Sequence, residues 1–128
     1  MAEALTTVEE LTTQLEAIFG STRVLRDPEL RDRYARDTGH GQPRRPDVVV
    51  MAQTTEEVQR AVKLANRYRI PVTPRSSGVG FYGAGIPEQG GMVIDMSAMN
   101  RVRRVDRRNR WALYEAGVTY GQLQEELR

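Results

Sequence analysis

A stretch rich in glycine and serine, residues 75–85, contains the residues of this sequence that are best suited to binding a ligand. It reads Arg-Ser-Ser-Gly-Val-Gly-Phe-Tyr-Gly-Ala-Gly. Glycine lets the backbone turn through positive φ and approach a ligand closely, and consecutive N–H groups in such turns form concave anion-binding sites. Arg75 adds a positive charge, and Ser76 and Ser77 add hydroxyl donors. The stretch therefore predicts a cradle for a pyrophosphate, with a plain glycine-rich turn between two strands as the alternative.

The same stretch contains a Gly-x-Gly-x-x-Gly spacing, at Gly78, Gly80 and Gly83, which is typical of Rossmann dinucleotide sites. Such a site needs a helix directly after the glycines, because the helix N-terminus supplies N–H groups and a positive dipole for the pyrophosphate. Residues 84–91 read Ala-Gly-Ile-Pro-Glu-Gln-Gly-Gly, and in a helix interior glycine costs about 1 kcal/mol and proline about 3 kcal/mol. We therefore predict a glycine loop between extended segments, and we interpret Asp95 as a strand-end or turn residue and not as a ribose ligand.

The other reactive residue types offer little catalytic chemistry. His40 is the only histidine and stands between two glycines, so we interpret it as a solvated loop residue. The absence of cysteine excludes disulfides, thiolate catalysis and cysteine-ligated zinc, and no acidic cluster predicts a metal site. Tyr82 and Tyr120 could donate protons, but we interpret both as packing residues. The sequence thus predicts a binding site and leaves the catalytic residues unknown.

Length and composition are those of one globular domain. The chain has 128 residues, of which 39% are hydrophobic and 28% charged, with a net charge of +2. No apolar run approaches the roughly 18 residues of a membrane span, and the N-terminus lacks the basic start and the apolar stretch of a signal peptide. We therefore expect a soluble, cytoplasmic protein without a membrane span.

Positive charge gathers in residues 101–110, which carry six arginines against one aspartate. Such a stripe could bind nucleic acid, and a nucleic-acid binder is one hypothesis for the function. Aromatic side chains that could stack on bases are not interleaved with these arginines, and Trp111 only follows them. We therefore favour a solvated hairpin and do not expect nucleic acid as a partner.

Two helices are predicted at the N-terminus. Thr7 and Glu10 fit a capping box for the first helix, and Gly20 is suited to end it. Asp27-Pro28 predicts the N-cap and the first position of a short second helix that reaches about Ala35.

A β-α-β unit is predicted in the middle of the chain. Residues 48–52 form an apolar run that is typical of a strand buried on both faces. Thr54 and Glu57 fit a second capping box, which opens a helix with one apolar stripe. Residues 71–74 return as a strand, which we expect to run parallel to the first after a right-handed crossover. The other predicted elements are a loop at 37–46, the glycine loop, a strand at 92–96, an antiparallel pair at 102–106 and 111–116, and a helix at 120–128 capped by Thr119. The fold class predicted from these elements is α+β.

Five short blocks of sequence follow one another in the second part of the chain. They are Pro46-Asp-Val-Val-Val, Thr54-Thr-Glu-Glu-Val, Ile70-Pro-Val-Thr-Pro-Arg-Ser-Ser-Gly, Gly90-Gly-Met-Val-Ile-Asp-Met and Glu115-Ala-Gly-Val-Thr-Tyr-Gly-Gln-Leu. Their order and spacing resemble the start of the PCMH-type FAD-binding domain of the vanillyl-alcohol oxidase superfamily, from about residue 34 to the end. The resemblance implies an N-terminal helical segment at residues 1–36 and an incomplete FAD-binding domain, its first half, at residues 37–128.

The resemblance implies that FAD is the cofactor and that the glycine loop wraps its pyrophosphate with backbone N–H groups. Members of the family commonly have Arg-Gly-Gly-Gly-Thr or a similar sequence in this loop, so Val79 gives up a hydroxyl group. The loop contains no histidine through which FAD could be attached covalently. The cofactor-binding residues implied are Arg75, Ser76, Ser77, Gly78, Val79 and Gly80.

The resemblance also implies a function, the N-terminal FAD-binding portion of an oxidoreductase in which a hydride passes from an alcohol or a 2-hydroxy acid to FAD. The spacing from Arg75 to Pro87 is more similar to the branch that oxidises glycolate and D-lactate, whereas the Gly-Val-Thr-Tyr-Gly-Gln-Leu run at residues 117–123 resembles the phenol-oxidising branch. We favour the former slightly and keep the latter as the alternative. In the family the FAD-binding domain continues and a substrate domain follows, so the expected partners are a small-molecule substrate and a missing C-terminal part or a second copy of the chain. The alternative is a non-catalytic fragment or accessory subunit with weak or no FAD binding.

Overall fold

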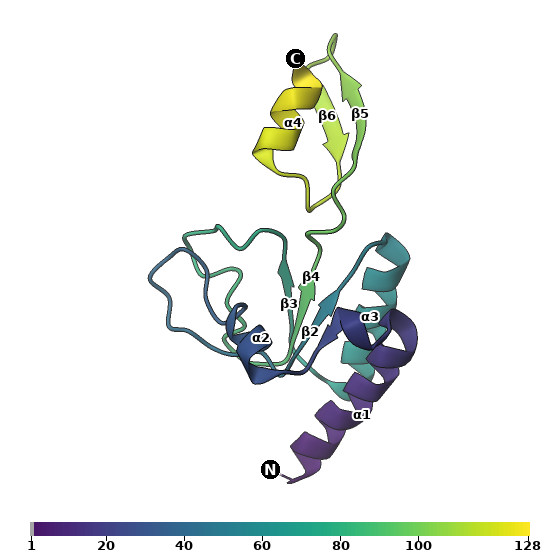
Figure 1. Ribbon diagram of the computed structural model, residues 1–128, viewed down its shortest axis with the longest axis vertical. Coiled ribbons are helices and arrows are strands. Elements are labelled where there is room, and N and C mark those ends of the chain that lie inside the picture. Colours follow the sequence, from purple (N-terminus) through teal and green to yellow (C-terminus); the bar gives the residue numbers. More distant parts are fainter. Residues whose placement is uncertain (1) are drawn as a thin grey trace.

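The computed structural model describes residues 2–128, with side chains from residue 7 onward, and shows two lobes joined by a narrow neck (Figure 1). The predicted α+β class is confirmed. We call residues 2–96 the sheet lobe, residues 97–101 and 115–117 the neck, and residues 102–114 and 118–128 the hairpin lobe.

The sheet lobe contains a four-stranded sheet. Its strands are β1 (Val24–Leu25), β2 (Val48–Met51), β3 (Val72–Arg75) and β4 (Met92–Asp95), in the spatial order β1-β2-β4-β3. β2, β4 and β3 run parallel, and β1 runs antiparallel to β2. The two strands of the predicted β-α-β unit are thus parallel, but β4 lies between them. Every residue of β4 is buried, whereas β3 follows Pro71 and contains Pro74. Proline lacks the N–H group that a central strand needs, so β3 is suited to the edge of the sheet.

Helices α1 (Ala2–Phe19) and α3 (Thr55–Tyr68) cover one face of this sheet (Figure 1). The apolar stripe predicted for α3 is confirmed, since its residues lie in or against the core. Side chains of α1 and β1 belong to the same core as those of β2 and β4, and the division of the chain at residue 36 stays a prediction. The core includes Leu11, Leu15, Phe19, Val24, Val48, Val50, Ala61, Ala65, Met92 and Ile94.

The first helix is longer than predicted. It begins at Ala2 and not at Thr7, so the predicted capping box lies inside the helix. The residues before Thr7 include alanine, glutamate and leucine, which are strong helix formers, and the helix therefore extends through them. It ends at Phe19, and Gly20 follows with φ 80°, which confirms the predicted stop. A short 3₁₀ helix, η1 (Ser21–Arg23), leads into β1.

The second helix, α2 (Pro28–Asp32), is shorter than predicted. Asp27 caps it as expected, because its Oδ1 accepts the N–H groups of Glu29 and Leu30 at 2.8 and 3.4 Å. The predicted end at Ala35 is wrong, since the N–H groups of residues 34 and 35 donate to carbonyls three residues back and the chain leaves the α-helix. Among residues 2–128, no helix combines the length and the apolar character needed to cross a membrane.

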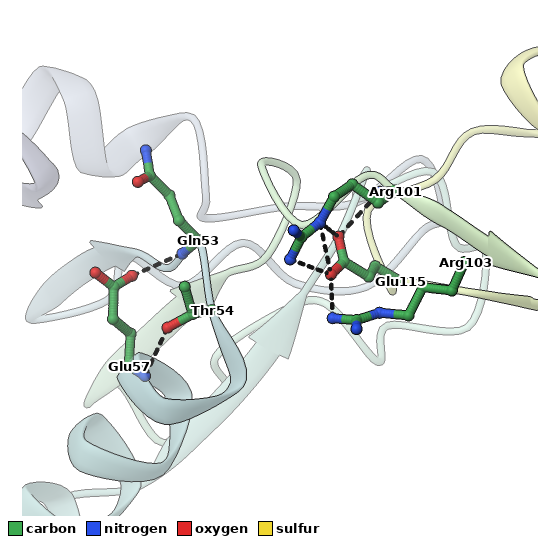
Figure 2. Close-up of polar contacts among 6 residues, drawn as sticks. All are labelled: Gln53, Thr54, Glu57, Arg101, Arg103 and Glu115. Atoms are coloured by element: carbon green, nitrogen blue, oxygen red, sulfur yellow. Dashed lines mark hydrogen bonds and ion pairs between the residues drawn. The ribbon is translucent and has the colours of Figure 1, made fainter.

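The start of α3 forms only half of the predicted capping box (Figure 2). Thr54 Oγ1 accepts the Glu57 N–H at 3.2 Å. The Glu57 carboxylate accepts the N–H of Gln53 at 2.8 Å instead of that of Thr54, and it forms a two-pronged ion pair with Arg23. The hydrogen bonds from Arg23 lower the pKa of Glu57. The glutamate therefore ties α3 to the chain segment before β1.

Two long loops lie side by side next to the sheet. The first contains the loop predicted at 37–46, and the second is the glycine loop. The N–H and the hydroxyl of Thr38 donate to the Gly80 carbonyl at 3.2 and 3.0 Å. Asp37 accepts the N–H of Gly83 at 2.8 Å. The first loop thus supports the glycine loop.

The hairpin lobe consists of β5 (Val102–Asp106), β6 (Trp111–Tyr114) and α4 (Tyr120–Leu127). The predicted antiparallel pair is confirmed. β6 ends at Tyr114 and not at the predicted Ala116, because the chain enters the neck directly after Tyr114. Thr119 caps α4 in a complete capping box with Gln122. The six arginines of residues 101–110 are all exposed, and no residue of the hairpin lobe is buried.

Candidate functional site

A cavity of about 470 Å³ lies between the two lobes, and we call it the interlobe cavity. The glycine loop lines a second hollow of about 250 Å³ together with Asp37. Two larger hollows, of about 570 and 590 Å³, lie along β3 and under the hairpin, and neither contains any of residues 75–80. Ser76, Ser77 and Val79 of the glycine loop thus line both the interlobe cavity and the second hollow. The interlobe cavity is lined by Ser76, Ser77, Val79, Tyr114, Ala116, Gly117, Val118, Thr119, Tyr120 and Leu123.

The backbone of the glycine loop presents free donors. Among the described residues, the N–H groups of residues 77–80 find no hydrogen-bond acceptor. Gly78 has φ 70°, and a Cβ there would lie 2.2 Å from a guanidinium nitrogen of Arg75, so the position requires glycine. Successive free N–H groups in such a turn attract an anion. This loop thus has the geometry that a phosphate or pyrophosphate needs.

Arg75, the last residue of β3, supports the loop from behind. Its guanidinium donates to the carbonyls of Arg36 at 2.9 Å, Tyr34 at 3.3 Å and Gly85 at 3.4 Å. It also lies over the Tyr34 ring, 5.3 Å from the centroid. The side chain therefore joins the two ends of the glycine loop to the segment after α2, while its charge stays beneath Gly78.

Tyr34, which is half-buried, and the buried Asp95 form a polar pair under the same loop. The Tyr34 hydroxyl donates to Asp95 Oδ2 at 2.6 Å, and Asp95 Oδ1 accepts the N–H of Ser97 at 2.8 Å. Burial, followed by the hydrogen bond to Asp95, raises the pKa of Tyr34 above its usual range. Asp95 is the last residue of β4, as predicted, and it pairs in register with Arg75. Sequence reasoning missed Tyr34, because nothing local marks a tyrosine that meets a carboxylate 61 residues away.

The opposite wall of the interlobe cavity comes from the neck and the start of α4. A Cβ at Gly117 would lie 2.4 Å from the Met96 carbonyl oxygen, so only glycine brings this segment against the end of β4. Thr119 and Tyr120 place the N-terminus of α4 at the cavity. Sequence reasoning on the glycine loop alone did not identify this wall, and its one local signal was the Gly-Val-Thr-Tyr run of the fifth block.

The remaining candidates lie apart or make few contacts. His40 is exposed in the loop before β2. The interpretation of Tyr82 and Tyr120 as packing residues is wrong, since they are 98% and 90% exposed. Within the described part of the chain, no group of three or more histidine or acidic side chains is placed to hold a metal ion.

A match to a known protein family identifies the domain to which the glycine loop belongs. A profile of the family described as FAD binding domain matches residues 46–128. The chain belongs to this family of FAD-binding domains.

Individual relatives of this FAD-binding domain agree with the match. The chain is 34% identical over 117 residues to an uncharacterised FAD-linked oxidoreductase of Mycobacterium tuberculosis, covering 91% of this chain and 26% of the relative. It is 34% identical over 106 residues to the D-lactate dehydrogenase of Anaerostipes hadrus, covering 81% of this chain and 22% of the relative. The crystal structure of p-cresol methylhydroxylase with substrate bound superimposes with a TM-score of 0.86 at 29% identity, covering 95% of this chain and 24% of that chain.

These comparisons confirm the PCMH-type FAD-binding domain and its superfamily, and with it FAD as the cofactor. The chain spans about a quarter of the length of the curated relatives it matches. The residues present fit the cofactor at one point: the free N–H groups of the glycine loop and the hydroxyls of Ser76 and Ser77 are suited to its pyrophosphate.

Proposed function

We propose that this chain is the N-terminal FAD-binding portion of an oxidoreductase that oxidises an alcohol or a 2-hydroxy acid. The observation that carries the proposal is the row of free N–H groups at residues 77–80, which lies where a cavity opens between the two lobes. An anion held there would be surrounded by fixed backbone dipoles and would need no charged side chain in contact with it. The proposed cofactor-binding residues are Arg75, Ser76, Ser77, Gly78, Val79 and Gly80.

Each residue of the loop has its own part in this proposal. The N–H groups of residues 77–80 and the hydroxyls of Ser76 and Ser77 donate to the pyrophosphate oxygens. Gly78 permits the turn, and Arg75 holds the loop in place through carbonyls on its far side. Val79 is 60% exposed and offers an apolar contact instead of a hydroxyl. The bound flavin supplies the redox chemistry, since it accepts a hydride from the substrate.

The names of two relatives support the proposed substrate class. By its name, the relative from Anaerostipes hadrus oxidises D-lactate, and p-cresol methylhydroxylase acts on p-cresol. We prefer a 2-hydroxy acid to a phenol as the substrate because of the spacing from Arg75 to Pro87 in the sequence. We further propose a cytoplasmic location, and a C-terminal part or a second copy of the chain to complete the substrate site.

Titration with nucleotides tests the proposal. The purified chain is titrated with FAD, with FMN and with ADP, and binding is followed by flavin fluorescence, by calorimetry and by the rise in melting temperature that a ligand of the native state produces. We expect FAD to bind, ADP to compete with it and FMN to compete weakly, because FMN lacks the pyrophosphate. A chain that copurifies without flavin absorbance and shows no shift with FAD would instead be the non-catalytic alternative.

A further inference from the structure

The neck is the connection between the two walls of the interlobe cavity. Figure 1 shows the hairpin lobe beyond the end of the sheet: the chain leaves the sheet lobe after β4, and after β6 it turns back beside this connection before it enters α4. Two backbone hydrogen bonds join the two segments of the neck, from Glu115 N–H to the Arg101 carbonyl at 3.0 Å and from Gly117 N–H to the Met99 carbonyl at 2.8 Å. A small rotation at the neck would therefore change the width of the cavity.

Glu115 is the buried polar centre of this neck (Figure 2). Its side chain is 5% exposed, although the arginines that bind it are 67% and 50% exposed. The carboxylate accepts the N–H of Arg101 at 2.9 Å, the Arg101 guanidinium at 2.9 Å and the Arg103 guanidinium at 2.6 Å. The hydrogen bonds from the Arg101 side chain, followed by the one from its N–H, lower the pKa of Glu115 to about 2. The carboxylate is thus charged at every physiological pH.

These contacts join the two chain segments of the neck to each other and to β5. Arg101 ends the segment that leaves β4, Arg103 lies in β5, and Glu115 begins the segment that returns from β6. Because the two arginines are solvated, their ion pairs contribute little to stability. What the contacts supply is a fixed geometry, because they hold the two segments of the neck and the start of β5 around one buried carboxylate.

We infer that Glu115 is a positioning residue, which fixes the width of the interlobe cavity through Arg101 and Arg103 and so sets the affinity for the cofactor. The inference rests on the proposed FAD site for its second half only. Ala116, Gly117 and Val118, the three residues after Glu115, line the cavity. A loss of the Glu115 contacts would therefore move that wall relative to Ser76, Ser77 and Val79.

Distance measurements between the lobes test the first half. The chain contains no cysteine, so Lys63→Cys on α3 and Arg108→Cys in the hairpin turn, both at exposed positions, give a single pair of spin labels. Double electron–electron resonance without FAD is expected to give one narrow distance distribution, which Glu115→Gln broadens. Glu57→Gln is the matched control, since it removes the charge of an arginine-paired glutamate within the sheet lobe and should leave the distribution narrow.

FAD titration of the same variants tests the second half. Glu115→Gln should weaken FAD binding by about tenfold, the effect expected for one charge-assisted hydrogen bond, whereas Glu57→Gln should not. A distribution that stays narrow in folded Glu115→Gln overturns the inference. If Glu115→Gln loses its circular dichroism signal, Arg103→Ala decides instead: a broader distribution supports the inference, and an unchanged one overturns it. Failure of the wild-type chain to bind FAD would refute the proposed function and leave the distance result to decide the role of Glu115.

Discussion

The central residues of β2 and β4 in the sheet lobe have at most 2% of their surface exposed to solvent, whereas Trp111 and Leu113 of the hairpin lobe are 43% and 54% exposed. Burying one large apolar side chain stabilises a fold by about 1.5–3 kcal/mol, whereas a solvent-exposed ion pair contributes about 1 kcal/mol or less. The candidate site thus has one wall held by an apolar core and another held mainly by the neck.

The largest expected effect is the loss of core packing in the sheet lobe. Ile94 lies in β4 with 2% of its surface exposed, so Ile94→Ala should lower the free energy of unfolding by about 2–5 kcal/mol. The matched change Leu113→Ala, at an exposed position of β6, should alter it by about 0.5 kcal/mol or less. Urea denaturation followed by circular dichroism measures both. Equal losses for the two variants would mean that the lobes do not differ in the way described.

A smaller effect is expected under the glycine loop. Tyr34→Phe removes the hydroxyl that donates to Asp95 and should lower the free energy of unfolding by about 1–3 kcal/mol, because it leaves a buried carboxylate oxygen without its partner. It should also weaken FAD binding, since Tyr34 contacts Arg75 beneath the loop. Tyr82→Phe, at a fully solvated hydroxyl, is the control and should change neither quantity. Thermal unfolding and FAD titration check both variants, and a Tyr34→Phe protein that behaves like Tyr82→Phe contradicts the prediction.

The sheet lobe also shows how far the sequence alone could go. The apolar run at β2, the stripe of α3 and the strand at β4 each have a local signature, and all three are confirmed. The position of β4 between β2 and β3 was not predicted, although Pro71 and Pro74 favour an edge position for β3. The predicted start of α1 was wrong, since a capping pattern inside a run of helix formers does not stop the helix.

The candidate site was predictable on one side only. Glycine content and two serines identified the loop, because the requirement for positive φ is visible in the residue types. The wall formed by the neck and α4 follows the loop by more than 30 residues in the sequence and meets it only in the folded chain. The contacts between Arg75, Tyr34 and Asp95 likewise require three distant segments to come together.

Glycine substitutions compare the neck with the hairpin lobe. At Gly121, in α4, the nearest atom to an added Cβ is 4.0 Å away, so Gly121→Ala should stabilise the chain by about 0.5–1 kcal/mol. Gly117→Ala should destabilise it, because the added Cβ would collide with the Met96 and Ser97 carbonyls. Melting temperatures that rise for the first variant and fall for the second are expected. Two rises would show that the neck is not tightly packed.

The smallest effect near neutral pH concerns Glu115. Its pKa is lowered from 4.5 to about 2, so its contribution to stability is fully present above pH 4.5 and is lost as the pH falls toward 2. The difference in melting temperature between the wild type and Glu115→Gln should therefore be constant from neutral pH to about pH 5. Below that it should shrink. A difference that does not change down to pH 2 would show that Glu115 is not held as a charged group.

The central claim is that free N–H groups of the glycine loop hold the FAD pyrophosphate, and one pair of glycines tests it directly. Gly78 and Gly20 both have positive φ, 70° and 80°, but Gly20 ends α1 outside the cavity-lining segments. Replacement by alanine strains each backbone by roughly 1–2 kcal/mol. Gly78→Ala should lose more stability than Gly20→Ala, because an added Cβ at Gly78 also displaces the Arg75 guanidinium, whereas one at Gly20 meets no atom within 4 Å. The decisive measurement is the dissociation constant for FAD of Gly78→Ala, Gly20→Ala and the wild type. We expect Gly20→Ala to bind as the wild type does and Gly78→Ala to bind at least about tenfold more weakly; wild-type affinity in a folded Gly78→Ala protein would contradict the claim.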